Sequence, residues 1–167
     1  ISPINMRSAL LDMIENEIQI AKKGYVASIT VKLNSLTDTI LLDALYKAVK
    51  AGVKVNLIIR GILTLKRTNE KNAGKINAIS IVDQYLEHAR VMIFHNKGNE
   101  KVFISSADWM VRNLDHRIEV AAPIYDKDIQ KDLKFLIEAC LNDNAKSRII
   151  DKGQKNHRYD GGEIVPY

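Results

Sequence analysis

The chain is poor in several residue types and patterns, and each shortage excludes a class of protein. A single cysteine, Cys140, among 167 residues excludes an internal disulfide and is typical of a reducing compartment. We therefore expect a cytoplasmic protein, with Cys140 packed into the core from a helix face. Aromatic residues make up only 6% of the chain, which argues against a stacking platform for single-stranded nucleic acid. No apolar run approaches the roughly 20 residues of a transmembrane helix, and no signal peptide opens the sequence.

Signatures of common phosphate and metal sites are missing as well. The sequence contains no Walker-type glycine loop, no dinucleotide-binding fingerprint and no Cys/His cluster with zinc spacing. We therefore expect no metal site built by this chain alone, so that a divalent ion would arrive with the phosphates of a substrate. The first residue is Ile1 rather than Met, and we expect the chain to be part of a longer polypeptide.

The overall composition is typical of a globular domain with a basic net charge. Hydrophobic residues make up 46% and charged residues 27%, and the length suffices for one domain with its own core. Twenty-five Lys and Arg against 20 Asp and Glu give a formal net charge of +5. Basic domains tend to bind polyanions, although such a charge also fits a surface that only keeps the protein in solution.

Hydrophobic periodicity predicts alternating helices and strands. We expect helices over residues 6–23, 40–51 and 126–141, and strands over 25–33, 54–60, 76–82, 90–95, 101–105 and 116–121. Ser2 and Pro3 are typical of the cap and first turn of a helix, and residues 65–75 predict a loop. The expected fold is an α/β domain over 1–143, with a mixed central sheet and helices on both faces, followed by a polar tail over 144–167.

Polar residues gather where the predicted strands begin or end. Lys32 and Asn34 close one strand, Arg60 closes the next, and His88 precedes another. Ligands of α/β sheets bind outside the carboxyl ends of the strands, where an arginine fork and a lysine charge suit phosphate oxygens. A histidine there can give or accept a proton, so we expect His88 to be catalytic and all four residues to bind phosphates. Local sequence equally fits solvated or turn-forming side chains.

A second polar group follows the strand over 101–105. The hydroxyls of Ser105 and Ser106 are candidates for holding an oxyanion. Asp108 is a candidate for orienting His88 by accepting the proton of one ring nitrogen. The alternative for Asp108 is a turn or helix cap.

Three further charged residues surround the next predicted strand. Arg117 and Glu119 alternate with apolar residues, which predicts that they share one strand face, with Arg112 nearby. We expect this cluster to hold the site residues in place without contacting the ligand itself. The alternative is a surface ion pair that contributes little to stability. The only tryptophan, Trp109, is expected to pack in the core.

Many of these residues belong to longer motifs that occur together in a fixed order. The motifs are Ser2-Pro3; Lys32-Leu33-Asn34-Ser35-Leu36-x-Asp38; Gly52-Val53-x-Val55-Asn56-Leu57-Ile58-x-Arg60-Gly61; Tyr85-Leu86-Glu87-His88-x-Arg90; and Ser105-Ser106-Ala107-Asp108-Trp109-Met110-x-Arg112-Asn113-Leu114-Asp115-x-Arg117-x-Glu119-Val120. With them, residues 2–158 resemble the C-terminal domain of bacterial polyphosphate kinase, the enzyme that makes polyphosphate from ATP.

The resemblance implies a phospholipase-D-like fold. The phospholipase D superfamily uses His-x-Lys, then Asp after a short spacer, then Gly-Ser-x-Asn. The corresponding positions here are His88-x-Arg90, His95 and Ser105-Ser106-x-Asp108. These departures argue against hydrolysis of a phosphodiester and favour the kinase.

The resemblance also implies a reaction and its partners. The full-length enzyme would transfer the γ-phosphoryl of ATP reversibly to polyphosphate, through a phosphohistidine on a preceding domain that this chain lacks. Arg60 and His88 would contact the nucleotide phosphates, His88 would act as proton donor, and Mg²⁺ would bridge the ATP phosphates. The partners would be ATP or ADP, polyphosphate and the other domains of the polypeptide, in a cytoplasmic homo-oligomer that binds no nucleic acid. Membrane association of the full-length enzyme stays open.

Two other functions remain as alternatives. A phospholipase-D-like phosphodiesterase would hydrolyse nucleic acid or lipid and would dimerise to bring two histidines together. A non-catalytic polyanion-binding module would bind through charge alone and would be indifferent to His88. For the kinase, we expect the isolated chain to be inactive, because half of the active site lies on another domain.

Overall fold

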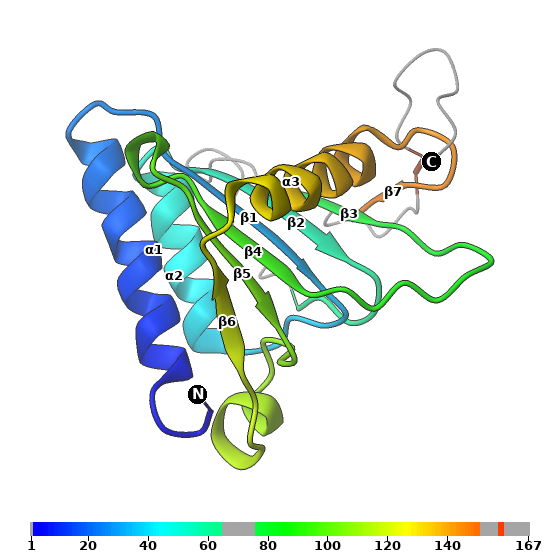
Figure 1. Ribbon diagram of the computed structural model, residues 1–167, viewed down its shortest axis with the longest axis horizontal. Coiled ribbons are helices and arrows are strands. Elements are labelled where there is room, and N and C mark those ends of the chain that lie inside the picture. Colours follow the sequence, from blue (N-terminus) through cyan, green and yellow to red (C-terminus); the bar gives the residue numbers. More distant parts are fainter. Residues whose placement is uncertain (1, 65–75, 151–156, 159–167) are drawn as a thin grey trace.

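The chain folds into a seven-stranded mixed sheet that carries helices on both faces (Figure 1). The computed structural model describes residues 2–64, 76–150 and 157–158, so the loop predicted over 65–75 lies outside the described residues. The elements are α1 (Met6–Lys22), β1 (Ser28–Leu33), α2 (Thr39–Lys50), β2 (Lys54–Ile59), β3 (Asn77–Ser80), β4 (Val91–Phe94), a 3₁₀ turn (Asn96–Gly98), β5 (Lys101–Ser105), a π-helical turn (Arg112–His116), β6 (Ala121–Ile124), α3 (Lys127–Asn142) and β7 (Arg148–Ile149).

The order of the strands brings several strand ends to one edge of the sheet. The order is β6-β5-β4-β1-β2-β3-β7, in which β1, β2 and β3 run parallel and the other neighbours run antiparallel. The carboxyl ends of β1, β2, β3 and β5 therefore lie at the same edge as the start of β4. β7 comes from the segment 144–167, so the sheet includes part of the predicted tail.

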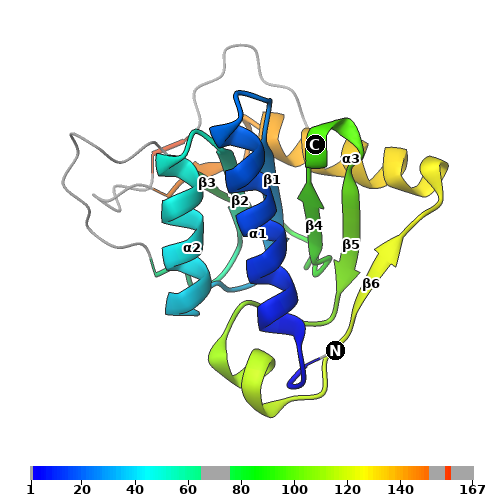
Figure 2. The same ribbon diagram turned by 90° about the vertical axis from the view of Figure 1, so that its left-hand side faces the viewer.

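The two faces of the sheet are covered differently. The helices α1 and α2 pack together on one face, and α3 crosses the other (Figures 1 and 2). Because β2 is covered on both faces, its last five residues are all buried, which explains its continuous apolar run. This arrangement confirms the expected α/β fold with a mixed sheet and helices on both faces. In the described part of the chain, no helix has the length and apolar character needed to cross a membrane.

The start of the chain differs from the expectation. The helix α1 begins only at Met6, so Ser2 is not its cap. Instead Ser2 is fully buried, its hydroxyl donates to the backbone carbonyl of Asn113, and its backbone N–H donates to Glu119. A long-range contact thus takes up the hydroxyl that the local pattern assigned to a helix cap.

The strand expected over 116–121 was also wrong. A π-helical turn occupies Arg112–His116, and β6 begins only at Ala121. Arg117 and Glu119 therefore do not share a strand face, since Arg117 is exposed and Glu119 is buried. The physical reason is that the Glu119 carboxylate accepts hydrogen bonds from the Ser106 hydroxyl and the Asn113 amide inside this loop.

One arginine ties α1 to two other segments. Arg7 donates to Asp38 at 2.8 Å and also binds Asp115 in the π-helical turn. Asp38 is the N-cap of α2, and its other oxygen accepts the backbone N–H of Leu41 at 2.9 Å. Hydrogen bonding by Arg7 lowers the pKa of Asp115 although burial opposes this. A single buried carboxylate, Asp38, thus serves both a helix end and an ion pair.

We predict that Asp38→Ala destabilises the chain more than Asp126→Ala. Both residues cap helices, but Asp126 is exposed and its carboxylate only caps α3. Loss of a cap costs about 1 kcal/mol, and loss of the Arg7 contact should bring Asp38→Ala to about 2–3 kcal/mol. Urea unfolding measures the difference, and equal losses for the two variants would contradict this account of Asp38.

Candidate active site

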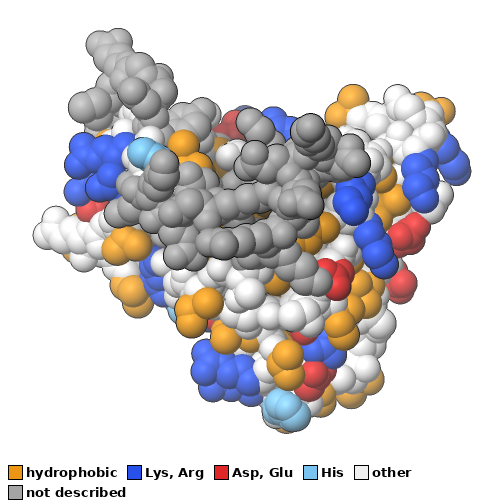
Figure 3. All heavy atoms as spheres, turned by 180° about the vertical axis from the view of Figure 1, so that it is seen from behind, with side chains coloured by type: hydrophobic (Ala, Val, Ile, Leu, Met, Phe, Trp, Pro, Cys, Tyr) orange, Lys and Arg blue, Asp and Glu red, His pale blue; other side chains and the backbone are white. Residues whose placement is uncertain are grey.

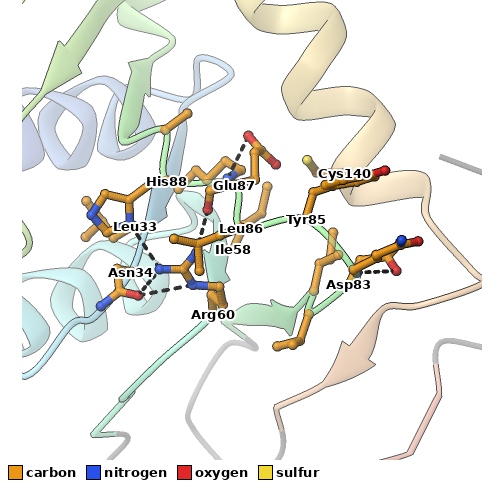
Figure 4. A pocket seen from close by; sticks show the side chains of 15 residues that line it. Leu33, Asn34, Ile58, Arg60, Asp83, Tyr85, Leu86, Glu87, His88 and Cys140 are labelled. Atoms are coloured by element: carbon orange, nitrogen blue, oxygen red, sulfur yellow. Dashed lines mark hydrogen bonds and ion pairs between the residues drawn. The ribbon is translucent and has the colours of Figure 1, made fainter.

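A cavity of about 560 Å³ lies where β1 and β2 end. Its walls come from the last residues of these strands, from the segment 81–89 that leads into β4, and from Cys140 of α3 (Figure 4). Cys140 is buried as expected. The location follows the general rule that ligands of α/β sheets bind outside the carboxyl ends of the strands. Lys32, Asn34, Arg60 and His88, which the sequence singled out, all line this one cavity.

Arg60 is held in one orientation by three hydrogen bonds to two neighbours. Its Nε and Nη2 donate to Oδ1 of Asn34 at 3.2 and 2.6 Å, and its Nη1 donates to the backbone carbonyl of Glu87 at 2.8 Å (Figure 4). The following residue, Gly61, approaches the end of β1 so closely that a Cβ there would lie 2.9 Å from the carbonyl oxygen of Asn34. This close approach fixes the backbone that carries the Arg60 guanidinium.

His88 lies between two guanidinium groups. Its Nδ1 is 3.0 Å from Nη2 of Arg60, and its Nε2 is 2.7 Å from Nη2 of Arg90. A guanidinium only donates, whereas a neutral imidazole has one acceptor nitrogen and an imidazolium has none. At most one of the two contacts is therefore a satisfied hydrogen bond. An oxyanion placed among these three side chains would accept hydrogen bonds from all of them.

Asp108 fixes the second guanidinium. The carboxylate is buried and accepts hydrogen bonds from the backbone N–H groups of Asn34 (2.9 Å) and Ser35 (3.2 Å) and from Nε of Arg90 (3.0 Å). Burial alone would raise the pKa of Asp108, but the hydrogen bonds from Arg90 and Ser35 outweigh it, and the pKa lies below its usual value. Asp108 is therefore an anion that neutralises and orients Arg90.

The expected direct contact between Asp108 and His88 is replaced by a relay. Arg90 lies between the two residues, because the Asp108 carboxylate is already committed to Arg90 and to the backbone after β1. Arg90 is not among the site residues predicted from the sequence. The available signal was the His88-x-Arg90 spacing, which in an extended segment sends both side chains to the same side.

The hydroxyls of the last residue of β5 and of the residue that follows it have partners in the loop between β5 and β6. The Ser105 hydroxyl donates to the carbonyl of Val120 at 3.1 Å and accepts the N–H of Ala107, while the Ser106 hydroxyl donates to Glu119. These contacts give both serines a role in holding the loop that presents Asp108. Phosphate binding by Ser105 and Ser106 stays a prediction.

Other candidates lie outside the cavity or do not gather into a metal site. Arg112 and Arg117 are exposed and do not line the cavity, and Trp109 is buried in the core as expected. Within residues 2–64, 76–150 and 157–158, no three His, Cys, Asp or Glu side chains come together to hold a metal ion. Among the described residues, the carboxylates that line or adjoin the cavity are each paired with a basic side chain: Glu87 with Lys32, Asp83 with Lys146 and Asp108 with Arg90. This donor set does not fit a resident Mg²⁺, which needs free oxygen ligands.

Comparison with known proteins decides the family. Residues 1–164 match the family model for the polyphosphate kinase C-terminal domain 2. The chain belongs to this family. It is 49% identical over 156 residues to the polyphosphate kinase of Klebsiella pneumoniae and 47% identical to that of Escherichia coli K12, covering 93% of this chain and 23% of each relative. The chain thus spans about a quarter of the length of the curated relatives it matches, and the expected family is confirmed.

Solved structures agree with this assignment and with the expected fold. The crystal structure of polyphosphate kinase from Porphyromonas gingivalis matches the chain with a TM-score of 0.88 and 40% identity, over 96% of this chain and 25% of that one. Nuc, a phospholipase D family member from Salmonella typhimurium, matches with a TM-score of 0.62 and 19% identity, over 87% and 91% of the two chains. NucT from Helicobacter pylori gives 0.58 and 18%, over 84% and 91%. These two distant matches show the fold alone, and they confirm that it is phospholipase-D-like.

We predict a pH-dependent loss of stability for Asp108→Asn. The folded-state pKa of Asp108 lies below its ordinary value of 3.8, so its ionised form stabilises the fold above that pH and this contribution disappears as the pH falls through the lower folded value. The variant should lose about 2 kcal/mol at neutral pH and less below pH 3.8. Urea unfolding at both pH values measures this, with Asp132→Asn, an exposed change on α3, as control. A deficit that does not change with pH would contradict it.

Proposed function

We propose that this chain supplies the phosphate-binding half of a polyphosphate kinase active site. The proposed reaction is the reversible transfer of the γ-phosphoryl group between ATP and polyphosphate, with the acceptor histidine on another domain of the same polypeptide. The observation that carries the proposal is the position of His88 between the guanidinium groups of Arg60 and Arg90 at the mouth of a cavity.

The geometry suits the charge changes of phosphoryl transfer. In the first step a bond forms between the γ-phosphorus and a nitrogen of the acceptor histidine on the other domain, while the bond between this phosphorus and the ADP oxygen breaks. In the second step a terminal oxygen of polyphosphate attacks phosphorus and the bond to nitrogen breaks. Both steps need fixed cations around the phosphoryl oxygens, because catalysis of this transfer is mainly positioning and electrostatic stabilisation. Arg60 and Arg90 are such cations, and His88 lies between them as the proton donor.

The role of Mg²⁺ follows from the same donor set. Because the carboxylates next to the cavity face basic side chains, Mg²⁺ would be held by the phosphates of ATP rather than by this chain. The ion would neutralise phosphate charge when it enters with the nucleotide.

The way in which the arginines beside His88 are held supports a local phosphate site over binding by net charge alone. On the face shown in Figure 3, the described Lys and Arg side chains lie in separate groups, with hydrophobic and uncharged surface between them. A module that binds polyanions by charge alone needs a continuous basic band. The two arginines beside His88, in contrast, are oriented by specific hydrogen bonds.

We predict that Arg60→Gln weakens the binding of inorganic tripolyphosphate to this chain about tenfold or more, because a charge-assisted hydrogen bond to phosphate is lost. The matched control is Lys54→Gln, an exposed change at the opposite end of β2. It removes the same charge and should change the affinity less than about twofold. Isothermal titration calorimetry measures both. Equal losses for the two variants would indicate binding by net charge and would overturn the proposal.

We predict that the chain by itself makes no polyphosphate from ATP and Mg²⁺. The reason is that the acceptor histidine of the proposed mechanism lies on another domain. Release of ADP together with formation of acid-stable polyphosphate is the measurement. Sustained synthesis by the purified chain that is lost in His88→Ala would show that the chain holds a complete active site.

A further inference from the structure

The cavity contains an ion pair that the proposed mechanism does not use. Nζ of Lys32 is 3.1 Å from Oε1 of Glu87, and both residues line the cavity together with Arg60 and His88. Lys32 is on β1, beside Ile58 and Val91, which pack against α3. Glu87 is on the segment that leads into β4 (Figure 4). The Glu87 carboxylate is thus paired with the Lys32 ammonium inside a cavity whose other basic groups suit phosphate.

The two side chains of this ion pair differ in their exposure to solvent. The Lys32 side chain is 9% exposed and is fixed by its place in the sheet, whereas the Glu87 side chain is 39% exposed. The backbone of Glu87 is held independently, because its carbonyl accepts the hydrogen bond from Arg60. Of the two partners the carboxylate is the more exposed, so a ligand that binds Lys32 would displace the carboxylate while the backbone of the segment that carries His88 stays in place.

A phosphate group and the Glu87 carboxylate would compete for the same cation. Both are oxyanions, and a lysine ammonium binds either one as a point charge. A ligand with several phosphates, held at Arg60 and His88 by one of them, presents the next one to Lys32 at a high effective concentration. A single phosphate held at Arg60 gains nothing from displacing the carboxylate.

We propose that Lys32 forms a second phosphate subsite and that Glu87 is its internal competitor. The proposal rests on the function proposed above and adds a specificity-determining residue to it. The carboxylate fills the subsite when no ligand is bound, and its return when the ligand leaves makes the binding of oligophosphates weaker and more readily reversible. Such reversibility suits a site at which a chain of phosphates must bind and then be released.

The test compares Glu87→Gln with the parent chain in binding inorganic tripolyphosphate and orthophosphate. Without the competitor, tripolyphosphate should bind about fivefold more tightly, mostly through slower dissociation, and orthophosphate should change less. Glu87→Asp keeps the charge but shortens the side chain, and should give a smaller gain. Glu100→Gln is the matched control, because it removes a carboxylate that pairs with Lys134 at 2.8 Å away from the cavity. It should leave both affinities unchanged.

A double variant separates competition at Lys32 from a general effect of charge. In the Lys32→Gln background, Glu87→Gln should no longer tighten tripolyphosphate binding. An equal gain with and without Lys32, or no gain at all, while Arg60→Gln still weakens binding about tenfold or more, would overturn the competitor role and leave the proposed function standing. Binding of tripolyphosphate that does not depend on Arg60 would overturn both. Urea unfolding of each variant confirms that the compared chains are folded.

Discussion

The site depends on one buried carboxylate. Asp108 comes from the loop after β5, yet it accepts the backbone N–H groups of Asn34 and Ser35 after β1 and the side chain of Arg90 before β4. Asn34 in turn binds Arg60, and Arg90 contacts His88. Both guanidinium groups beside the histidine are therefore connected to this anion, Arg90 directly and Arg60 through Asn34. Buried charges persist when they are paired and hydrogen-bonded, and Asp108 meets both conditions with groups from two other segments.

The arrangement also explains how several cations can face one cavity in the absence of ligand. Arg60 is held by an amide oxygen and a backbone carbonyl, Arg90 by Asp108, and Lys32 by Glu87. Each guanidinium keeps at least one nitrogen directed at His88, so the donors are in position before an anion arrives. Groups that are oriented beforehand need no reorganisation when charge develops, which is how fixed dipoles and charges lower a reaction barrier.

The sequence predicted the parts of the structure that follow from local periodicity. The strands β1 and β2 and the helix α2 came from apolar patterns, and the rule about carboxyl strand ends then placed Lys32, Asn34, Arg60 and His88 near one another. The spacing His88-x-Arg90 indicates that the two side chains point to the same side, but it does not indicate that Arg90 binds Asp108, because that contact joins two different segments of the chain. The prediction of a strand over 116–121 was wrong because the loop over 112–120 is also shaped by long-range contacts. Its conformation depends on contacts such as that of Ser2 with Asn113, across 111 residues.

The distance along the chain between Asn34 and Asp108 has a consequence for biosynthesis. The two residues are 74 positions apart, so the N–H groups that Asp108 binds are made long before their acceptor is translated. A nascent chain, or a peptide that contains only His88 and Arg90, lacks the anion that orients the guanidinium groups. Affinity for phosphate therefore appears together with the completed sheet, and a bound phosphate in turn favours the folded chain by mass action.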